Sequence, residues 1–343
     1  MSTYFCKPDD IINGTTFLSN FINSSDSNNY NLIIYESITE RDVFFSELNH
    51  ISNSYFKSIS EKLVSKNIKL YFILSGVPHD YYELYNHPNI HIIFAPFYFI
   101  TFLINQCNID TWDSYNEIYK KNLLNNTFDK LVLNLNRRPH YHRCLMMDCA
   151  SKSGLIGNMI YTWQETEQKY DYYRFRWWIP QKISIDMESE NYNCFGVLQG
   201  NTAFHLVTES DIAHITFSEK VFKPILAGIP FLVFGGVGFH QKLKEYGFEL
   251  YDEIFDYSFD SVVNDENRAF LICDNFLKHK NKNYKELVES IYDKVERNRN
   301  HALNIFNNKE FIPNKLIHIF NKYVRDNEEI VPQVHHRLKE YLN

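Results

Sequence analysis

The sequence lacks an excess of basic residues. Its 343 residues include 35 Lys and Arg against 42 Asp and Glu, which gives a formal net charge of -7. A protein that binds duplex DNA needs a net basic face to neutralise phosphates, so this balance argues against a nucleic-acid partner. Hydrophobic residues make up 44% and charged residues 22% of the chain. That composition is typical of a folded protein, and the length suggests about two domains.

Paired cysteines, a leader segment and a long apolar run are also missing. The six cysteines are scattered without C-x-x-C spacing, and we expect them to be reduced thiols of a cytosolic protein. The start, MSTYFCKPDD, has neither a basic nor an apolar region of the kind found in secretory signals. The apolar run from Ile90 to Ile104 is broken by Pro96 and is shorter than the roughly 20 residues of a spanning helix. The sequence therefore predicts a cytoplasmic location and no membrane span.

Motifs for dinucleotides and metals are absent as well. No G-x-G-x-x-G follows an early strand, and the glycine-rich segment 234–238 lies late and lacks the last glycine of that motif. A Rossmann dehydrogenase is therefore disfavoured. The nearest approach to Asp-x-Asp is at 186–188, and His140 and His142 have no third ligand in range. We expect no metal.

What the sequence does contain is an alternation of short apolar runs with segments of helical period. This pattern is typical of parallel sheets covered by helices. It predicts strands at 31–35, 69–74, 90–94, 130–135, 159–163, 203–207 and 231–234, and helices near 55–64 and at 142–153 and 284–301. A polar stretch at 122–129 separates two such arrays. We therefore predict an α/β protein with Rossmann-like domains over residues 1–127 and 128–325, followed by a terminal helix over 326–343.

The densest cationic segment follows the predicted strand 130–135. Asn136, Arg137 and Arg138 come directly after that strand, and Arg143 falls in the first turns of the next predicted helix. A helix N-terminus offers backbone N–H groups and positive potential, and the arginine fork suits phosphate oxygens. The segment therefore indicates an anion site. The alternative is a solvated turn whose arginines pair with local carboxylates.

A second group of polar residues surrounds the next helix start. Glu209 and Ser210 follow the predicted strand 203–207, and Ser218 is a good N-cap with Glu219 behind it. Lys220 is different, because a cation in the first helical turn is disfavoured by the helix dipole. Such a residue is useful where an anion binds. The alternative is an ordinary surface lysine.

The order of these residues resembles the donor half of a GT-B glycosyltransferase. The closest resemblance is to the α-1,3-fucosyltransferase family and to similar viral and bacterial glycosyltransferases, and it covers about residues 131–255. It rests on Asn136 with Arg143, on Glu209-Ser210, and on Ser218-Glu219-Lys220 leading into a helix that ends Ala227-Gly228-Ile229-Pro230. The family has Asn where this chain has Ser210 and Thr where it has Ser218. Its motifs have no counterpart in the N-terminal part of the chain.

The resemblance implies two facing Rossmann-like domains with a central cleft. It also implies inverting, metal-independent transfer of a sugar from a nucleoside-diphosphate donor, a GDP- or UDP-sugar, to a hydroxyl of a glycan or protein acceptor, with no other cofactor. Arg143, with Arg137 or Arg138, and Lys220 would neutralise the diphosphate. Glu219 would bond the ribose or sugar, and Glu209 would line the sugar pocket. The implied donor-binding set is Asn136, Arg137, Arg138, Arg143, Glu209, Ser218, Glu219 and Lys220.

An inverting transfer also needs a base for the acceptor hydroxyl. Glu36 and Asp80 come at or after the ends of predicted strands in the N-terminal domain, on the edge where a ligand crevice is expected. Each is equally explained as a helix cap or a solvated loop residue. The alternative to an enzyme is a non-catalytic module of the same fold that binds a nucleotide sugar or a glycan.

Overall fold

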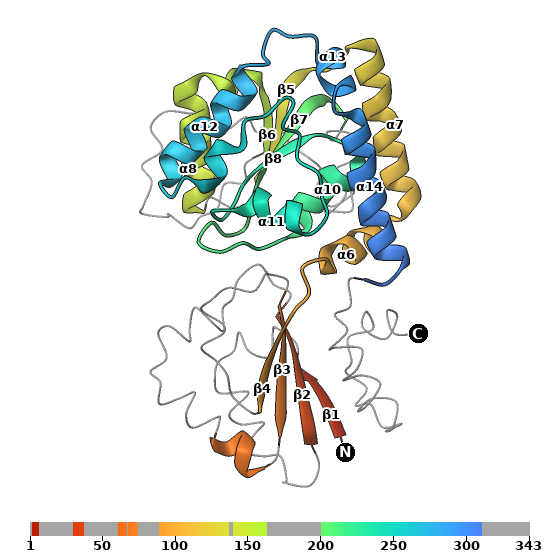
Figure 1. Cartoon of the computed structure of the whole chain (residues 1–343), viewed down its shortest axis with the longest axis vertical. Coiled ribbons are helices and arrows are strands. Elements are labelled where there is room, and N and C mark those ends of the chain that lie inside the picture. The colour runs from red at the N-terminus through yellow and green to blue at the C-terminus, as the bar shows by residue number, and fades with distance from the viewer. Residues whose placement is uncertain are drawn as a thin grey trace. The chain divides into compact units, whose positions relative to one another are not determined.

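The computed structural model describes residues 2–6, 30–37, 61–66, 68–74, 89–136, 140–162 and 200–310. The chain divides into two compact units (Figure 1). One consists of Met1–Tyr98 with Lys309–Asn343, and the other of Phe99–Asn308. Each unit has a parallel sheet of its own, so the expectation of a mixed α/β protein is confirmed.

The first unit contains a four-stranded parallel sheet in the order β1-β2-β3-β4. Its strands are β1 (Ser2–Cys6), β2 (Tyr30–Ser37), β3 (Lys69–Leu74) and β4 (Ile90–Phe94). The last three were predicted, whereas β1 was not. Glu36 lies in β2, one residue before the strand ends, and pairs in register with Ile73 of β3. Asp80 lies outside the described residues.

The second unit contains another four-stranded parallel sheet, in the order β6-β5-β7-β8. The strands are β5 (Lys130–Leu135), β6 (Met159–Thr162), β7 (Thr202–Thr208) and β8 (Phe231–Phe234). Every residue of β7 and β8 is buried. Parallel strands covered on both faces are expected to form such continuous apolar runs, which is why all four were recognisable from the sequence.

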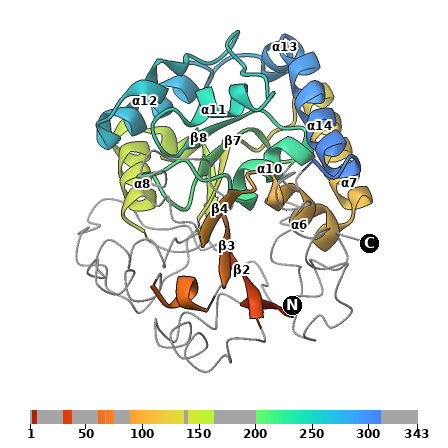
Figure 2. The same ribbon diagram turned by 60° about the horizontal axis from the view of Figure 1, so that its bottom comes forward.

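Helices cover both faces of this second sheet (Figures 1 and 2). On one side lie α8 (Tyr141–Ser153) and α12 (Asp265–Leu277), and on the other α7 (Ile109–Asn125), α10 (Glu219–Ala227) and α14 (Tyr292–Asn307). Further helices are α6 (Tyr98–Cys107), α11 (Phe239–Glu245), α13 (Tyr284–Glu289) and the short 3-10 turns Leu155–Asn158 and Tyr257–Ser261. Residues 61–65 of the first unit are also helical. This covered parallel sheet is the scaffold for the site described below.

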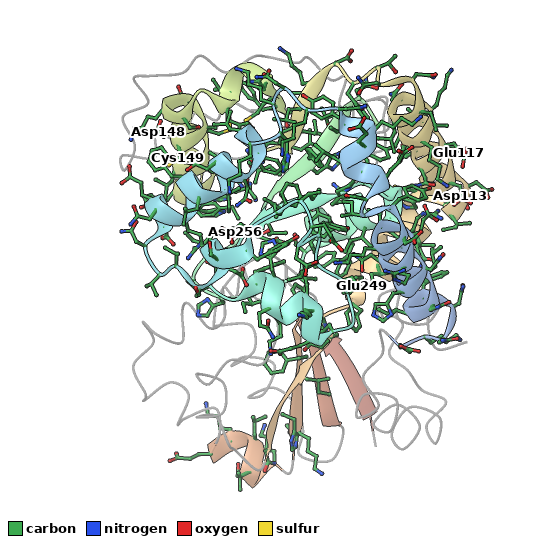
Figure 3. The ribbon with its side chains drawn as sticks, turned by 45° about the horizontal axis from the view of Figure 1, so that its top comes forward. Asp113, Glu117, Asp148, Cys149, Glu249 and Asp256 are labelled. Atoms are coloured by element: carbon green, nitrogen blue, oxygen red, sulfur yellow. The ribbon has the colours of Figure 1, made fainter. Side chains whose placement is uncertain are left out.

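The polar stretch at 122–129 contains the end of α7 and the turn that leads into β5. Within α7, Asn116 Nδ2 donates to Ala227 O at 3.0 Å and Tyr119 Oη donates to Ala203 O at 2.9 Å. Asp113 of the same helix pairs with Arg299 of α14; Figure 3 labels Asp113 on the outer side of the unit. The second compact unit therefore begins well before residue 128, because α7 is bonded to its sheet and helices. The domain limits at 127 and 325 stay predictions.

The single helix predicted at 284–301 is two helices. Ile291, with φ -119° and ψ 3°, separates α13 from α14. The apolar stripe of the prediction is nevertheless buried across the break, with Val288, Ile291 and Val295 at 0, 1 and 1% exposure. Burial of the stripe does not require a continuous helix, so periodicity alone did not reveal the break.

The cysteines do not all match the expectation of reduced thiols. Cys144, Cys149 and Cys273 are free and buried, and burial raises the pKa of each thiol to about 12. Cys107, at the end of α6, is disulfide-bonded, so for this residue the expectation is wrong. In the described residues no helix has the length and apolarity needed to cross a membrane. The cytoplasmic location stays a prediction.

Candidate functional site

The order of the second sheet reverses between β5 and β7. The chain passes from β5 to β6 on one side and then returns to place β7 on the other side of β5. In open α/β sheets, ligands bind outside the carboxyl ends of the strands at such a switch point. The segments that follow β5 and β7 are therefore the natural place for a site.

At the end of β5, two buried asparagines tie neighbouring strands together. Asn134 Nδ2 donates to Leu206 O at 2.6 Å and to Thr208 Oγ1 at 3.0 Å, both on β7. Asn136 N donates to Thr162 Oγ1 at 3.1 Å, and its side-chain amide bonds to Asn134 Oδ1. Asn136 is 2% exposed, and its Oδ1 has no hydrogen-bond partner in the structure. This places an amide oxygen with acceptor capacity at the switch point.

Helix α8, which follows β5, begins without the usual compensation of its dipole. His140 is its N-cap but makes no side-chain cap bond, and no acidic residue lies in the first turn. Its first turn holds instead His142 and Arg143, which are 7 and 3% exposed. No acidic residue of the first turn itself therefore offsets the positive potential at this helix start.

His142 connects α8 to the end of β7. Its Nε2 lies 2.6 Å from Glu209 O. A carbonyl oxygen only accepts, so Nε2 must carry the proton and donate. Burial, helped by Arg143, lowers the pKa of His142 to about 4, so the ring is neutral at pH 7.

Glu209, the residue after β7, is fully buried and connects the end of that strand to the start of α10. Its Oε1 accepts a bond from Ser218 N at 3.2 Å, and its Oε2 accepts bonds from Ser218 Oγ at 2.6 Å and Ser210 N at 3.0 Å. Burial raises the pKa of Glu209 to about 7, against the opposing effects of Lys220 and the Ser218 bonds. The carboxylate thus closes the loop between β7 and α10.

Lys220 lies in the first turn of α10, beside that loop. Ser218 Oγ caps the helix by accepting a bond from Lys220 N at 3.2 Å. The ammonium Nζ donates to Ser210 Oγ at 3.0 Å and to Glu219 Oε1 at 2.9 Å. The side chains of Lys220 and Glu219 are 17 and 16% exposed. A partly exposed cation and carboxylate therefore stand together at a helix N-terminus.

The loop between β7 and α10 carries one more polar pair. His214 Nδ1 lies 2.9 Å from Asp211 Oδ2, and Asp211 Oδ1 accepts a bond from Ala213 N at 2.9 Å. Burial raises the pKa of Asp211, but the bonds from His214 and Ala213 outweigh it and the pKa lies below its ordinary value. A Cβ on Gly236, after β8, would lie 2.6 Å from His214 O. The glycine therefore allows the loops after β7 and β8 to approach closely.

The structure brings together part of the predicted donor-binding set. Glu209, Ser218, Glu219 and Lys220 form one bonded cluster, and Asn136 lies at the end of the adjacent strand. Arg143 is in α8 beside His142 and is buried, so Lys220 is the more exposed of the two described cations. Arg137 and Arg138 lie outside the described residues.

Asn134, Ser210 and His142 contribute to the cluster but were not part of the predicted donor-binding set. Asn134 lies two residues before Asn136. Side chains alternate along a strand, so the spacing could have predicted that both asparagines lie on one face. Ser210 stands in the family's Asn position and bonds Lys220 instead. The bond of His142 could not be predicted from spacing, because its partner Glu209 is 67 residues away in the sequence.

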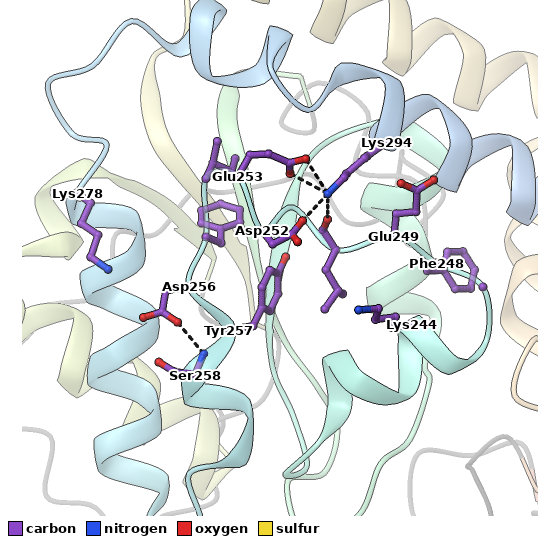
Figure 4. A pocket seen from close by; sticks show the side chains of 14 residues that line it. Lys244, Phe248, Glu249, Asp252, Glu253, Asp256, Tyr257, Ser258, Lys278 and Lys294 are labelled. Atoms are coloured by element: carbon purple, nitrogen blue, oxygen red, sulfur yellow. Dashed lines mark hydrogen bonds and ion pairs between the residues drawn. The ribbon is translucent and has the colours of Figure 1, made fainter.

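A separate pocket of about 850 Å³ lies on the loop after α11, beside α14 (Figure 4). It shares no residue with the cluster around Glu209. Three of its lining charges are paired with one another, because Lys294 Nζ bonds Glu253 at 2.8 Å and also Asp252. The same ammonium donates to Leu250 O at 3.0 Å. Among the residues described, no group of three His, Cys, Asp or Glu is placed to hold a metal ion. The expectation of metal independence stays a prediction.

Comparison with known proteins gives one distant likeness. The chain is similar to the crystal structure of an alpha1,3-fucosyltransferase, with a TM-score of 0.35 and 10% sequence identity over 86% of this chain and 90% of that one. A TM-score and an identity this low support no conclusion about function. No protein-family model matches the chain, and no curated protein matches it.

Proposed function

We propose that this protein is a glycosyltransferase that binds a nucleoside-diphosphate sugar at the carboxyl edge of its second sheet. The observation that carries the proposal is the meeting of two helix starts at the switch point. Both α8 and α10 have a cation in the first turn, and His142, Glu209 and Ser218 connect the two helices through the end of β7. Helix N-termini with cations suit a diphosphate.

In this proposal Lys220 and the N-terminus of α10 hold the diphosphate, with Arg143 adding positive potential from α8. Glu219, which is partly exposed beside Lys220, accepts a hydrogen bond from a donor hydroxyl of ribose or sugar. Asn136, whose buried Oδ1 keeps acceptor capacity at the switch point, is included in the proposed donor-binding set. These roles agree with the motif resemblance of the sequence.

The proposed reaction is inverting and metal-independent. The acceptor oxygen forms a bond to the anomeric carbon while the bond from that carbon to the β-phosphate oxygen breaks, and a base takes the acceptor proton. Negative charge then develops on the leaving diphosphate, where Lys220 and the helix dipole stabilise it. Glu36 and Asp80 remain the proposed bases. The N-terminal domain would bind the glycan or protein acceptor in a GT-B arrangement.

Binding titrations with GDP and UDP test the proposal. Lys220→Ala removes a charged hydrogen bond worth about 1.5–3 kcal/mol, so the Kd should rise about 10- to 100-fold. Lys152→Ala, which removes a surface lysine from the far end of α8, is the matched control and should bind as the wild type does. Equal affinity of wild type and Lys220→Ala would contradict the role of Lys220.

A transfer assay separates an enzyme from a binding module. Wild-type protein with donor sugars and a panel of glycan acceptors should release nucleoside diphosphate in step with product. Saturable nucleotide binding without any release across the panel would favour the non-catalytic alternative.

A further inference from the structure

Glu209 occupies the point where three segments of the second unit meet. Its backbone N donates to Phe234 O of β8 at 3.1 Å, and its backbone O accepts the bond from His142 of α8. Its side chain reaches the residue that caps α10. One residue thus connects the edge of the sheet with the starts of both helices assigned to the donor.

The carboxylate of Glu209 has its acceptors engaged inside the protein. Three donors surround it, namely Ser210 N, Ser218 N and Ser218 Oγ, and the residue is 0% exposed. Glu219, ten residues along, differs because its side chain keeps 16% exposure. This geometry does not suit Glu209 for the sugar contact implied by the motif.

The two serines that bond Glu209 are the same two that hold Lys220. Ser218 Oγ accepts from the backbone N of Lys220, and Ser210 Oγ accepts from its ammonium. Glu209 therefore holds Ser210 and Ser218, the two ends of the loop between β7 and α10. These serines in turn bond the ammonium and the backbone N–H of Lys220. Removal of the Glu209 carboxylate would therefore disturb both the backbone N–H and the ammonium of Lys220.

We propose that Glu209 is a positioning residue that holds Lys220 on the donor diphosphate without touching the donor. This inference rests on the proposed function, because it assumes that the bonds of Glu209 with Ser210 and Ser218 serve nucleotide binding. The ionised carboxylate accepts hydrogen bonds from all three neighbouring groups. An amide of the same shape would turn an NH₂ group toward one of the two backbone N–H groups and leave that bond unmade.

The first test measures GDP and UDP binding by calorimetry in Glu209→Gln. Loss of one buried hydrogen bond and the resulting displacement of Lys220 should raise the Kd about 10-fold. The matched control is Asp260→Asn, which alters another buried loop carboxylate that accepts backbone N–H groups, at the start of α11. It should lower the melting temperature by a similar amount and leave the Kd unchanged.

A double-mutant cycle shows whether Glu209 acts through Lys220. In a Lys220→Ala background, Glu209→Gln should change the Kd less than twofold, because the group it positions is already absent. A purely structural role would not produce this non-additivity. If Glu209→Gln does not fold, Ser218→Ala replaces it in the same cycle, since it removes one of the three donors to the carboxylate.

The outcomes are distinct. Wild-type affinity in Glu209→Gln, or a full 10-fold effect repeated in the Lys220→Ala background, would overturn the positioning role while leaving the proposed function intact. If wild-type protein binds neither GDP nor UDP, the proposed function fails and the inference fails with it.

Discussion

The starts of α10 and α11 are both held by a buried carboxylate, but they differ in the other groups that they contain. At each one, a buried carboxylate from a loop accepts backbone N–H bonds close to the first residues of the helix. Glu209 bonds Ser218 N at the start of α10, and Asp260 bonds the N–H groups of His240 and Gln241 at 3.1 and 3.0 Å in α11. The difference lies in what else each helix start holds.

The start of α11 is closed by its own contacts. Gly238, its N-cap, has no side chain to cap the helix, so Asp260 caps it. His240 is 1% exposed, with Nδ1 2.8 Å from Asp260 Oδ1 and Nε2 accepting from Val233 N at 3.1 Å. That last bond satisfies an N–H on β8. This helix start serves stability.

The start of α10 is organised around a cation that keeps some exposure. Its own Ser218 caps the helix, and the carboxylate of Glu209 holds the loop. Lys220 stands in the first turn at 17% exposure. We propose that the two carboxylates, although in similar settings, have different roles: Asp260 completes a helix start, and Glu209 positions a charged group. Stability and nucleotide binding should therefore respond separately to changes at the two sites.

The largest expected effect on stability is at α11. Asp260→Ala leaves His240 Nδ1 and two backbone N–H groups without their acceptor, so the free energy of unfolding should fall by about 3 kcal/mol. Urea denaturation measures this. Nucleotide affinity, measured at a temperature where the variant is folded, should stay the same. A loss of nucleotide affinity in Asp260→Ala would contradict the claim that the start of α11 affects stability alone.

The next effect concerns His142 and acid. Its pKa of about 4 in the folded protein lies below the 6.5 of an ordinary histidine. The unfolded chain therefore binds the proton more readily, and the stability contributed by His142 is lost as the pH falls from about 6.5 to 4. His142→Gln keeps a donor for Glu209 O. Between pH 6.5 and 4, its free energy of unfolding should fall by about 2–3 kcal/mol less than that of the wild type. Denaturation curves at several pH values check this, and identical pH dependence in the two proteins would contradict the buried neutral ring.

A smaller effect is expected at the far end of α10. Gly228 has φ +66°, and a Cβ there would lie 2.1 Å from Asn116 Nδ2. Gly228→Ala should cost about 2 kcal/mol of unfolding free energy without changing nucleotide affinity. Gly154→Ala at the end of α8 is the control, because its φ is +81° but nothing lies within 4 Å of the added carbon. It should cost about 1 kcal/mol. Equal losses would show that the close contact with Asn116 carries no energy.

Local patterns predicted the strands well and the contacts between distant segments poorly. Buried parallel strands such as β7 and β8 form continuous apolar runs, and Ser218 and Gly228 marked the ends of α10 correctly. Helix α7 was missed because most of its surface is polar, and its buried side chains act through bonds to β7 and α10.

The candidate site shows the same division. The residue types around Lys220 were evident from the sequence, but the part played by Glu209 depends on which donors surround its carboxylate. Those donors come from positions one and nine residues away, and the bond from His142 spans 67. No spacing rule predicts such a set of bonds, because the loop conformation determines it.

The most direct test of the account is calorimetric titration of GDP and UDP into wild-type protein and Lys220→Ala. The account predicts saturable binding of at least one nucleotide by the wild type and a Kd about 10- to 100-fold higher in the variant. Absence of binding to the wild type, or the same Kd in both proteins, would contradict it.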